Sequence, residues 1–151
     1  ADTSTLGGVS RIAANGDGIR VTGSSKAQVL GNVLRSNGVS QVATQDGIHV
    51  ENSASAIIDG NTLDANGLTT LAGRHGIYAK NDGASGLNFN GVKVTNNTLT
   101  GGDPLGRVAV ENGIHVESSS DGFLGLGNDP LISGNTVSFV GGNGIYVATT
   151  N

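Results

Sequence analysis

Polar and apolar positions alternate in a short phrase that recurs along the chain. In the segment 46–50, the apolar residues Ile48 and Val50 flank the polar His49. This two-residue period predicts a β-strand, whereas an amphipathic helix would space its apolar residues by three and four. Copies of the phrase, each built around Gly-Ile, occupy 17–21, 46–50, 75–79, 112–116 and 143–147. The pattern therefore predicts one strand that returns five times.

The length of the repeat predicts a solenoid. The glycines of the phrases are residues 18, 47, 76, 113 and 144, so successive repeats are 29, 29, 37 and 31 residues long. A period of this size is typical of architectures in which each repeat buries its apolar face against its neighbours. A repeat of 29 residues accommodates three short strands and three bends. We expect coils stacked about 4.8 Å apart, with parallel, in-register pairing.

This register predicts four interior columns of apolar side chains. Two come from the first strand, one from the second strand and one from the segment after the next bend. Their members are Ile19, Ile48, Ile77, Ile114 and Ile145; Val21, Val50, Ala79, Val116 and Val147; Val29, Ile58, Val94 and Ile132; and Leu34, Leu63, Leu99 and Val137. Branched side chains suit such a crowded stack of strands.

A second phrase follows each of the first four copies, at 31–34, 60–63, 96–99 and 134–137. Each copy places an asparagine at the same bend. These residues are Asn32, Asn61, Asn97 and Asn135. Stacked amides hydrogen-bond from one layer to the next, and an asparagine in a bend also satisfies local backbone groups. We therefore predict an asparagine ladder with a structural role.

Gly-Ile-x-Val followed by Gly-Asn-Thr-Leu or Asn-Asn-Thr-Leu resembles the repeat of the right-handed parallel β-helix family. The family includes pectate lyases, alginate epimerases, phage tailspikes and bacterial surface adhesins. The resemblance covers residues 17–147 and implies an all-β, right-handed parallel β-helix of about five coils, with three short strands per coil. We expect one domain over residues 1–151. The motif indicates the fold and almost nothing of the activity.

Two repeats carry extra residues, and we place these insertions at 81–91 and 118–130. Both fall at the same bend of adjacent coils, which predicts neighbouring loops on one edge. Two interpretations remain open: the loops bury their apolar residues against each other, or they bind a partner or ligand. The candidate binding residues are Phe89, Phe123, Leu124, Asp82 and Asp121. Such aspartates suggest Ca²⁺, although no EF-hand pattern or Gly-Gly-x-Gly-x-Asp nonapeptide occurs; we expect no other cofactor.

Neither end of the sequence shows an amphipathic helix that would cap a solenoid. Bare coil ends are edge strands that pair with further strands. Two explanations stay open: the chain is cut from a longer protein, or its ends meet those of other copies. Because head-to-tail contacts do not close, they generate a filament. We therefore expect self-association.

Two outward columns lie side by side on the face of the first strand, and several of their residues have acid–base chemistry. The first column contains Arg20, His49, Tyr78, His115 and Tyr146. The second, two residues further along each strand, contains Thr22, Glu51, Lys80, Glu117 and Ala148. Abstracting the proton beside a uronate carboxylate requires a base, an acid and a cation. The catalytic candidates are His49, Tyr78, Lys80, His115, Glu51 and Glu117. Known β-helix epimerases and lyases resemble this set in residue types, but the Asp-Pro-His segment typical of alginate epimerases is absent. The alternative is a solvated ladder of alternating charge without catalysis.

No metal site is expected on this face. His49 and His115 are two coils apart, about 9.6 Å by the stacking distance. That separation is too large for the two imidazoles to share a zinc ion.

Composition removes several classes of function. A net charge of −4 argues against nucleic acid, and 3% aromatic residues are too few for a base-stacking platform. No apolar run approaches the roughly 20 residues of a membrane span. Low charge, abundant glycine and the absence of cysteine favour a secreted or cell-surface, bacterial protein.

The sequence thus favours a non-enzymatic, extracellular solenoid that serves as a structural or adhesive module, in the form of a self-assembling filament or matrix subunit. The first alternative is a fragment of a polyuronate C5-epimerase or lyase. The second is a carbohydrate-binding module on the loop edge, with a polysaccharide as its partner.

Overall fold

The computed structural model describes residues 5–7, 17–23, 26–35, 46–51, 55–64, 74–81, 91–100, 111–119, 130–138 and 140–150. Within these ranges the chain forms strands and no helix. The strands are β1 (Thr5–Gly7), β2 (Ile19–Thr22), β3 (Gln28–Leu30), β4 (Val33–Arg35), β5 (Ile48–Glu51), β6 (Ile57–Asp59), β7 (Thr62–Asp64), β8 (His75–Asn81), β9 (Lys93–Thr95), β10 (Thr98–Thr100), β11 (Asn112–Ser119), β12 (Leu131–Ser133), β13 (Thr136–Ser138) and β14 (Ile145–Thr150).

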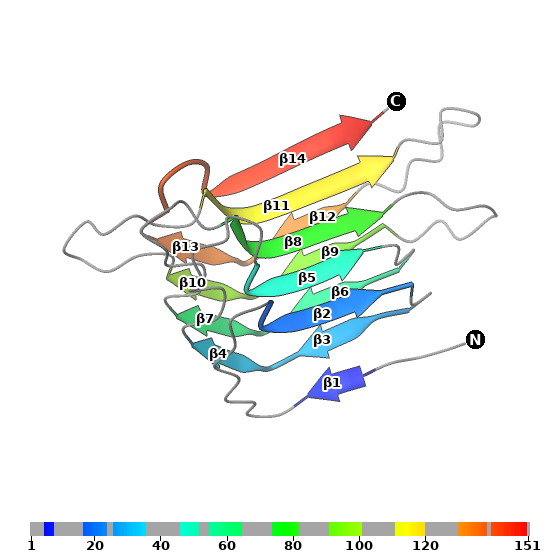
Figure 1. Ribbon diagram of the computed structural model, residues 1–151, viewed down its shortest axis with the longest axis horizontal. Coiled ribbons are helices and arrows are strands. Elements are labelled where there is room, and N and C mark those ends of the chain that lie inside the picture. The colour runs from blue at the N-terminus through cyan, green and yellow to red at the C-terminus, as the bar shows by residue number, and fades with distance from the viewer. Residues whose placement is uncertain are drawn as a thin grey trace.

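The strands form three parallel sheets that wind into one stack of coils. Strands β2, β5, β8, β11 and β14 make the first sheet, here called the β5 sheet. The β6 sheet contains β1, β3, β6, β9 and β12, and the β7 sheet contains β4, β7, β10 and β13. One coil therefore contributes one strand to each sheet, as β5, β6 and β7 do. Figure 1 shows the coils rising from β1 at the bottom to β14 at the top. This is the predicted parallel β-helix.

The pairing register confirms the predicted interior columns. Ile48 lies opposite Ile19 and Ile77, and the same in-register pairing continues through Ile114 to Ile145. Ile48, Ile77 and Ile114 are fully buried, as are the matching valines and alanine of the inner coils. Each buried branched side chain contributes roughly 1.5–3 kcal/mol of transfer free energy. The core is thus a stack of like side chains, repeated once per coil.

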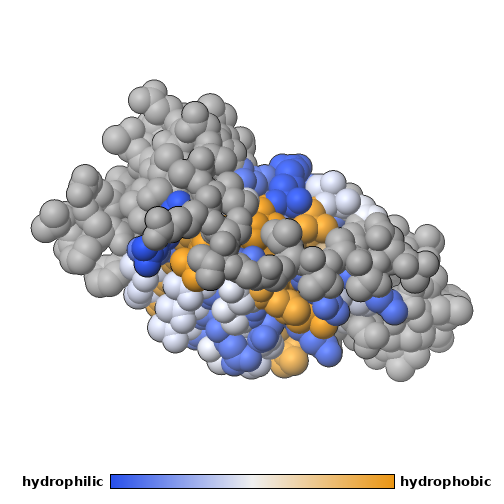
Figure 2. Space-filling model, turned by 90° about the horizontal axis from the view of Figure 1, so that it is seen from below, coloured by the Kyte–Doolittle hydropathy of each residue, from blue (hydrophilic) through white to orange (hydrophobic). Residues whose placement is uncertain are grey.

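The last described coil exposes the end of this core. Ile145 and Val147 occupy interior positions but remain 47% and 46% exposed. Leu131 and Tyr146 of the same end are also exposed. Figure 2, which views the molecule from the opposite end, shows hydrophobic residues gathered in the middle with hydrophilic residues beside them. Large apolar side chains of the stack therefore reach the surface at the β14 end, whereas Ile19 in β2, at the other end of the same column, is only 5% exposed.

The asparagines form the predicted ladder beside the core. The Nδ2 amide of Asn32 donates to Oδ1 of Asn61, and that of Asn61 donates to Oδ1 of Asn97, over 3.0 and 2.9 Å. The next rung, from Asn97 to Asn135, spans 3.0 Å. The backbone N–H of each donating asparagine bonds to the same oxygen. Each rung therefore joins two coils through two hydrogen bonds to one carbonyl oxygen.

The residue before each ladder asparagine has left-handed backbone geometry. Gly31, Gly60 and Gly134 have φ values of 63°, 65° and 65°, and Asn96 has a φ of 54°. Glycine adopts this region without steric cost, and asparagine is among the few other residues that tolerate it. The presence of glycine in three copies of the second phrase and asparagine in the other copy thus has a local backbone cause.

The predicted insertions begin inside strands. Strand β8 extends through Asn81, which pairs with Ser118, and β11 extends through Ser119, which pairs with Thr150 of β14. The remainder of both insertions, 82–90 and 120–129, lies outside the described residues, and so do the binding candidates Phe89, Phe123, Leu124, Asp82 and Asp121. No helix among the described residues is long and apolar enough to cross a membrane.

Candidate functional site

The outer face of the β5 sheet brings the catalytic candidates together. Register pairing places Arg20, His49, Tyr78, His115 and Tyr146 in one column and Thr22, Glu51, Lys80, Glu117 and Ala148 in the next. The rings of the first column stack along the solenoid. The ring centroids of His49 and Tyr78 are 4.8 Å apart, those of Tyr78 and His115 are 5.4 Å apart, and those of His115 and Tyr146 are 4.8 Å apart. We call this column the ring column.

His75, the first residue of β8, and Arg74, which precedes it, join the ring column from the bend. The imidazole of His75 lies 4.4 Å from that of His115 and 5.7 Å from the Tyr78 ring, between centroids. The guanidinium carbon of Arg74 lies 5.0 Å from the centre of the Tyr78 ring, which is cation–π distance. Tyr78 therefore contacts three rings and one cation.

The middle of the ring column is covered, whereas Arg20 and Tyr146 at its two ends are exposed. His49 and Tyr78 are each 4% exposed, and His75 is 2% exposed. Burial, with a smaller contribution from the Glu117 carboxylate, raises the pKa of Tyr78 to about 12. Burial, and then the positive charges of His115 and Arg74, lower the pKa of His75 to about 3. At neutral pH both groups are therefore uncharged.

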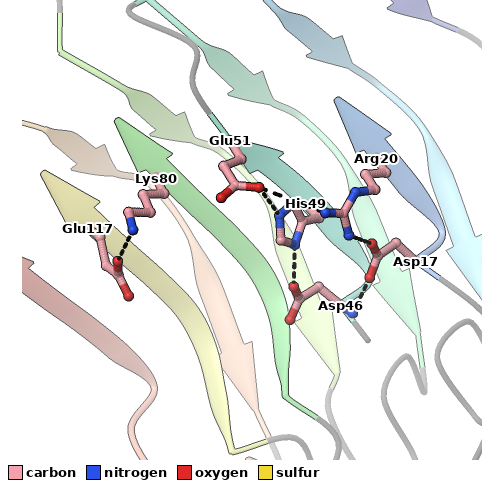
Figure 3. Close-up of polar contacts among 7 residues, drawn as sticks. All are labelled: Asp17, Arg20, Asp46, His49, Glu51, Lys80 and Glu117. Carbon is pink, nitrogen blue, oxygen red and sulfur yellow. Dashed lines mark hydrogen bonds and ion pairs between the residues drawn. The ribbon is translucent and has the colours of Figure 1, made fainter. Parts of the chain in front are cut away.

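His49 is held by a buried carboxylate on one side and a partly exposed carboxylate on the other (Figure 3). Its Nδ1 lies 2.7 Å from Oδ2 of Asp46, and its Nε2 lies 3.4 Å from Oε2 of Glu51. Burial alone would lower the pKa of His49, but the hydrogen bond and charge of Asp46 outweigh it and raise the pKa. Burial also raises the pKa of Asp46 against the opposing effect of His49. The pair consequently retains a proton more firmly than either group would in water.

Asp46 belongs to a second polar ladder, at the bend that precedes the β5 sheet. Oδ1 of Asp17 accepts the backbone N–H of Asp46 over 2.7 Å. Two coils further on, Oδ1 of Asn112 accepts both the backbone N–H and the side-chain amide of Asn143, over 3.1 and 3.0 Å. The position thus supports coil-to-coil bonds with either asparagine or aspartate.

Sequence reasoning missed Asp17, Asp46 and His75 as site residues. They occupy the position before the glycine of the first phrase. That position is polar in all five copies, as Asp17, Asp46, His75, Asn112 and Asn143. The signal that could have revealed these site residues was this polar column at the bend, three residues before the outward histidines. The reason for overlooking it is that strand alternation does not extend across the glycine.

The chain also contains an internal comparison for the Asp46–His49 pair. Residues 46–51 read Asp-Gly-Ile-His-Val-Glu and residues 112–117 read Asn-Gly-Ile-His-Val-Glu. With asparagine at the first position, neither ring nitrogen of His115 makes a hydrogen bond to a described residue. Oε1 of Glu117 lies 3.2 Å from His115 Nε2, but the two groups are not aligned for a hydrogen bond.

Charged side chains of the neighbouring column pair across coils. Nζ of Lys80 lies 3.5 Å from Oε2 of Glu117, with both side chains partly exposed. Arg20 of the ring column lies 3.0 Å from Oδ2 of Asp17 in its own coil and 3.8 Å from Oε2 of Glu51 in the next coil. The predicted alternation of charge is therefore present, although such exposed pairs contribute little stability.

A comparison with protein families assigns the chain. A family model described as "right handed beta helix region" matches residues 4–151. The chain belongs to this right-handed β-helix family. As the resemblance implied, the β-helix is a right-handed parallel solenoid with three strands per coil. Neither the curated proteins nor the solved structures contain a match to it.

The site of this β-helix has the groups for proton transfer and for metal ligation. His49, His115, Lys80 and Glu117 supply donors and acceptors on one face. Asp17, Asp46 and His49 each place one ligand atom within 4.8 Å of the others. The middle of the ring column is covered, and the exposed large hydrophobic side chains of the described residues, Leu131, Ile145, Tyr146 and Val147, lie at the β14 end of the coil stack.

Proposed function

We propose that this β-helix is an extracellular structural module that assembles by pairing the exposed coil around β14 with a coil of a second copy. The observation that carries the proposal is the exposure of Ile145 and Val147. Their column neighbours Ile114 and Val116 are fully buried. An apolar surface that continues an interior column is suited to another coil of the same register.

The edge strands supply complementary groups for such pairing. Strand β14 is the last strand of the β5 sheet and β2 is the first. Head-to-tail stacking would place β2 of one copy beside β14 of the next. Ile19 of β2 is itself only 5% exposed, so the exposed apolar surface at this joint comes from Ile145 and Val147. Tyr146, exposed at the end of the ring column, would then meet the exposed Arg20 and form a cation–π contact. Because this contact is heterologous, repeated pairing produces a filament.

The burial of the ring column supports a structural role over catalysis. A general base must reach the proton that it removes, at a heavy-atom distance of about 2.6–3.2 Å or through one water. His49 and Tyr78 are 96% covered (each 4% exposed) and contact each other and neighbouring rings. Rings that stack from the β5 coil to the β14 coil stabilise a solenoid. In this view the column rigidifies the outer face of the β5 sheet.

Analytical ultracentrifugation of the purified chain at increasing concentration tests the proposal, with electron microscopy of the heaviest fractions. We expect concentration-dependent oligomers and thin filaments. The variant Ile145→Asp should remain monomeric, because a charge at the joint would be buried without a partner. The control Thr98→Asp alters an exposed position of β10 on the β7 sheet and should assemble normally. Monomers of the unaltered chain at all concentrations would reject the proposal.

A second candidate function is proton transfer on a polyuronate, as in an epimerase or lyase. The observation that favours it is the Asp46–His49 hydrogen bond of 2.7 Å, since an oriented imidazole is the usual general base. The groups that transfer protons and bind the uronate carboxylate would come from His49, Tyr78, Lys80 and His115, with Glu51 and Glu117 beside them. Incubation with polyuronates would reveal a lyase by an unsaturated product and an epimerase by proton NMR. Loss of turnover in His115→Ala, with normal assembly, would favour this candidate over the structural one.

A further inference from the structure

Three side chains from two adjacent coils converge at the lower end of the ring column. Asp46 and His49 come from the coil of β5, and Asp17 comes from the coil of β2. Their ligand atoms all lie within 4.8 Å of one another, and all three side chains are buried or nearly so. We propose that Asp17, Asp46 and His49 bind one divalent transition-metal ion, of the class of Zn²⁺ or Mn²⁺.

A second observation points to a missing ligand at Asp46. Its side chain is fully buried, and its Oδ2 bonds to His49. Its other oxygen, Oδ1, is buried and has no hydrogen-bond partner among the described residues. A buried carboxylate oxygen without a partner is costly. A cation held at Oδ2 is within reach of Oδ1, because carboxylates chelate metals through one oxygen or both.

The donor set selects the class of ion. Two carboxylates and one imidazole are typical ligands of Zn²⁺, Mn²⁺ and Fe²⁺, whereas Ca²⁺ requires six to eight oxygens. Three protein ligands leave a further position for water, as in open metal sites. The pairing of Asp46 with His49 at positions i and i+3 across a bend fixes two of the three ligands in one turn of chain.

Binding requires two local adjustments. Zinc ligands lie about 2.0–2.2 Å from the ion, so Asp46 Oδ2 and His49 Nδ1 must separate from 2.7 Å to about 3.3 Å. The proton that they share then leaves to solvent. Arg20, which contacts Oδ2 of Asp17, must release that oxygen; its side chain is 55% exposed and has room to move. Glu51, on the other side of His49, adds negative charge that favours a cation.

The chain offers a matched comparison for the test. Asp46→Asn converts the segment 46–51 into the sequence of 112–117, which this β-helix already accommodates. The variant therefore removes one ligand from a position where asparagine is compatible with the fold. His115→Gln removes the equivalent imidazole at a place where asparagine, and not aspartate, stands three residues before it.

Isothermal titration of the EDTA-treated full chain with ZnCl₂, and separately with MnCl₂ and CaCl₂, tests the proposal. We expect one Zn²⁺ per chain, at least tenfold weaker binding in Asp46→Asn and in His49→Gln, and unchanged binding in His115→Gln. Imidazole nitrogen NMR should show a Zn²⁺-dependent shift at Nδ1 of His49. Circular dichroism identifies any variant that fails to fold, in which case Asp17→Asn replaces it.

Two results would overturn the proposal. One is a wild-type chain that takes up no Zn²⁺ or Mn²⁺. The other is uptake that Asp46→Asn and His49→Gln leave unchanged while His115→Gln abolishes it, which would place the ion elsewhere on the ring face. Both results are independent of whether the coils assemble into filaments.

Discussion

Asp46 accepts a hydrogen bond from His49 across 2.7 Å, whereas Asn112, at the same place two coils further on, leaves His115 without one. The two segments differ only in this first residue. A carboxylate accepts a hydrogen bond from the imidazole N–H, and its negative charge balances that of a protonated ring. An amide oxygen accepts a weaker hydrogen bond and carries no net charge. Within these two segments, the hydrogen bond to the histidine ring is thus present where the first residue is aspartate and absent where it is asparagine.

The first prediction concerns the stability that this pair contributes. Asp46→Asn should lower the free energy of unfolding by about 1–2 kcal/mol, because hydrogen bonds with charged groups are worth roughly 1.5–3 kcal/mol and the amide replaces part of that. Urea denaturation at pH 7 in the presence of EDTA measures the loss. Glu51→Gln is the control, since Glu51 lies 3.4 Å from His49 and is partly exposed; its effect should stay below about 0.5 kcal/mol. Equal losses in both variants would contradict the assignment.

The second prediction compares two members of one interior column. Ile77→Ala should cost about 2–5 kcal/mol, because Ile77 is fully buried and the change leaves a cavity. Ile145→Ala should cost less than about 1.5 kcal/mol, because Ile145 is 47% exposed. Denaturation at a concentration where the chain is monomeric checks both. Ile77→Asp should prevent folding, because it buries an unpaired charge; a folded Ile77→Asp would refute the register.

The third prediction concerns the asparagine ladder. Asn97 accepts two bonds from Asn61 and donates to the Ile58 carbonyl, so Asn97→Ala leaves buried polar groups of the preceding coil without partners. Each stranded group costs about 1–3 kcal/mol, and we expect a total loss near 3 kcal/mol. Thr98→Ala, at the exposed next residue, should change stability by less than about 0.5 kcal/mol. Thermal melts of the two variants side by side decide the matter, and a small loss in Asn97→Ala would show that the ladder is dispensable.

The fourth prediction concerns the close approach of coils at the first-phrase glycines. A Cβ at Gly113 would lie 2.7 Å from the carbonyl oxygen of Gly144 and still closer to Cγ1 of Val137. Overpacking of this kind costs about 1–3 kcal/mol or more, so Gly113→Ala should destabilise the fold. A Cβ at Gly144 meets no described atom within 4 Å. Gly144→Ala should therefore be neutral or slightly stabilising, and denaturation curves that show the reverse order would contradict the packing.

The fifth prediction concerns acid stability. The folded-state pKa of His75 is about 3, well below its ordinary value near 6.5, because burial and neighbouring positive charges oppose protonation. Below pH 6.5 the unfolded chain therefore binds a proton that the folded chain does not. Stability should fall as the pH drops from about 6.5 toward 3, by up to about 1.4 kcal/mol per pH unit from this group.

The variant His75→Asn isolates this contribution. Asparagine occupies the equivalent position in the next two coils, as Asn112 and Asn143. Melting temperatures of the two proteins at several pH values should converge or cross as the pH falls, because the variant lacks the imidazole. Parallel pH profiles would show that His75 does not carry the acid sensitivity.

Much of the fold follows from the sequence because the solenoid repeats its local rules. The alternation around Ile48 and Val50 predicts the strand, and the recurrence of the phrase fixes which residues share a column. In a parallel in-register stack, equal positions of successive repeats become direct neighbours. The columns and the asparagine rungs could therefore be predicted without coordinates.

The tertiary structure decided what surrounds the outward residues. Sequence places His49 and Tyr78 on the outer face but does not show that they are covered, since burial depends on what packs over the sheet. It also does not show that Asp46 reaches His49 around the bend at Gly47, or that His75 turns toward His115. Those contacts depend on backbone direction at a glycine, where the two-residue alternation of the strand is interrupted. The sequence thus determined the coil and its columns, and only the three-dimensional path of the bends determined the site.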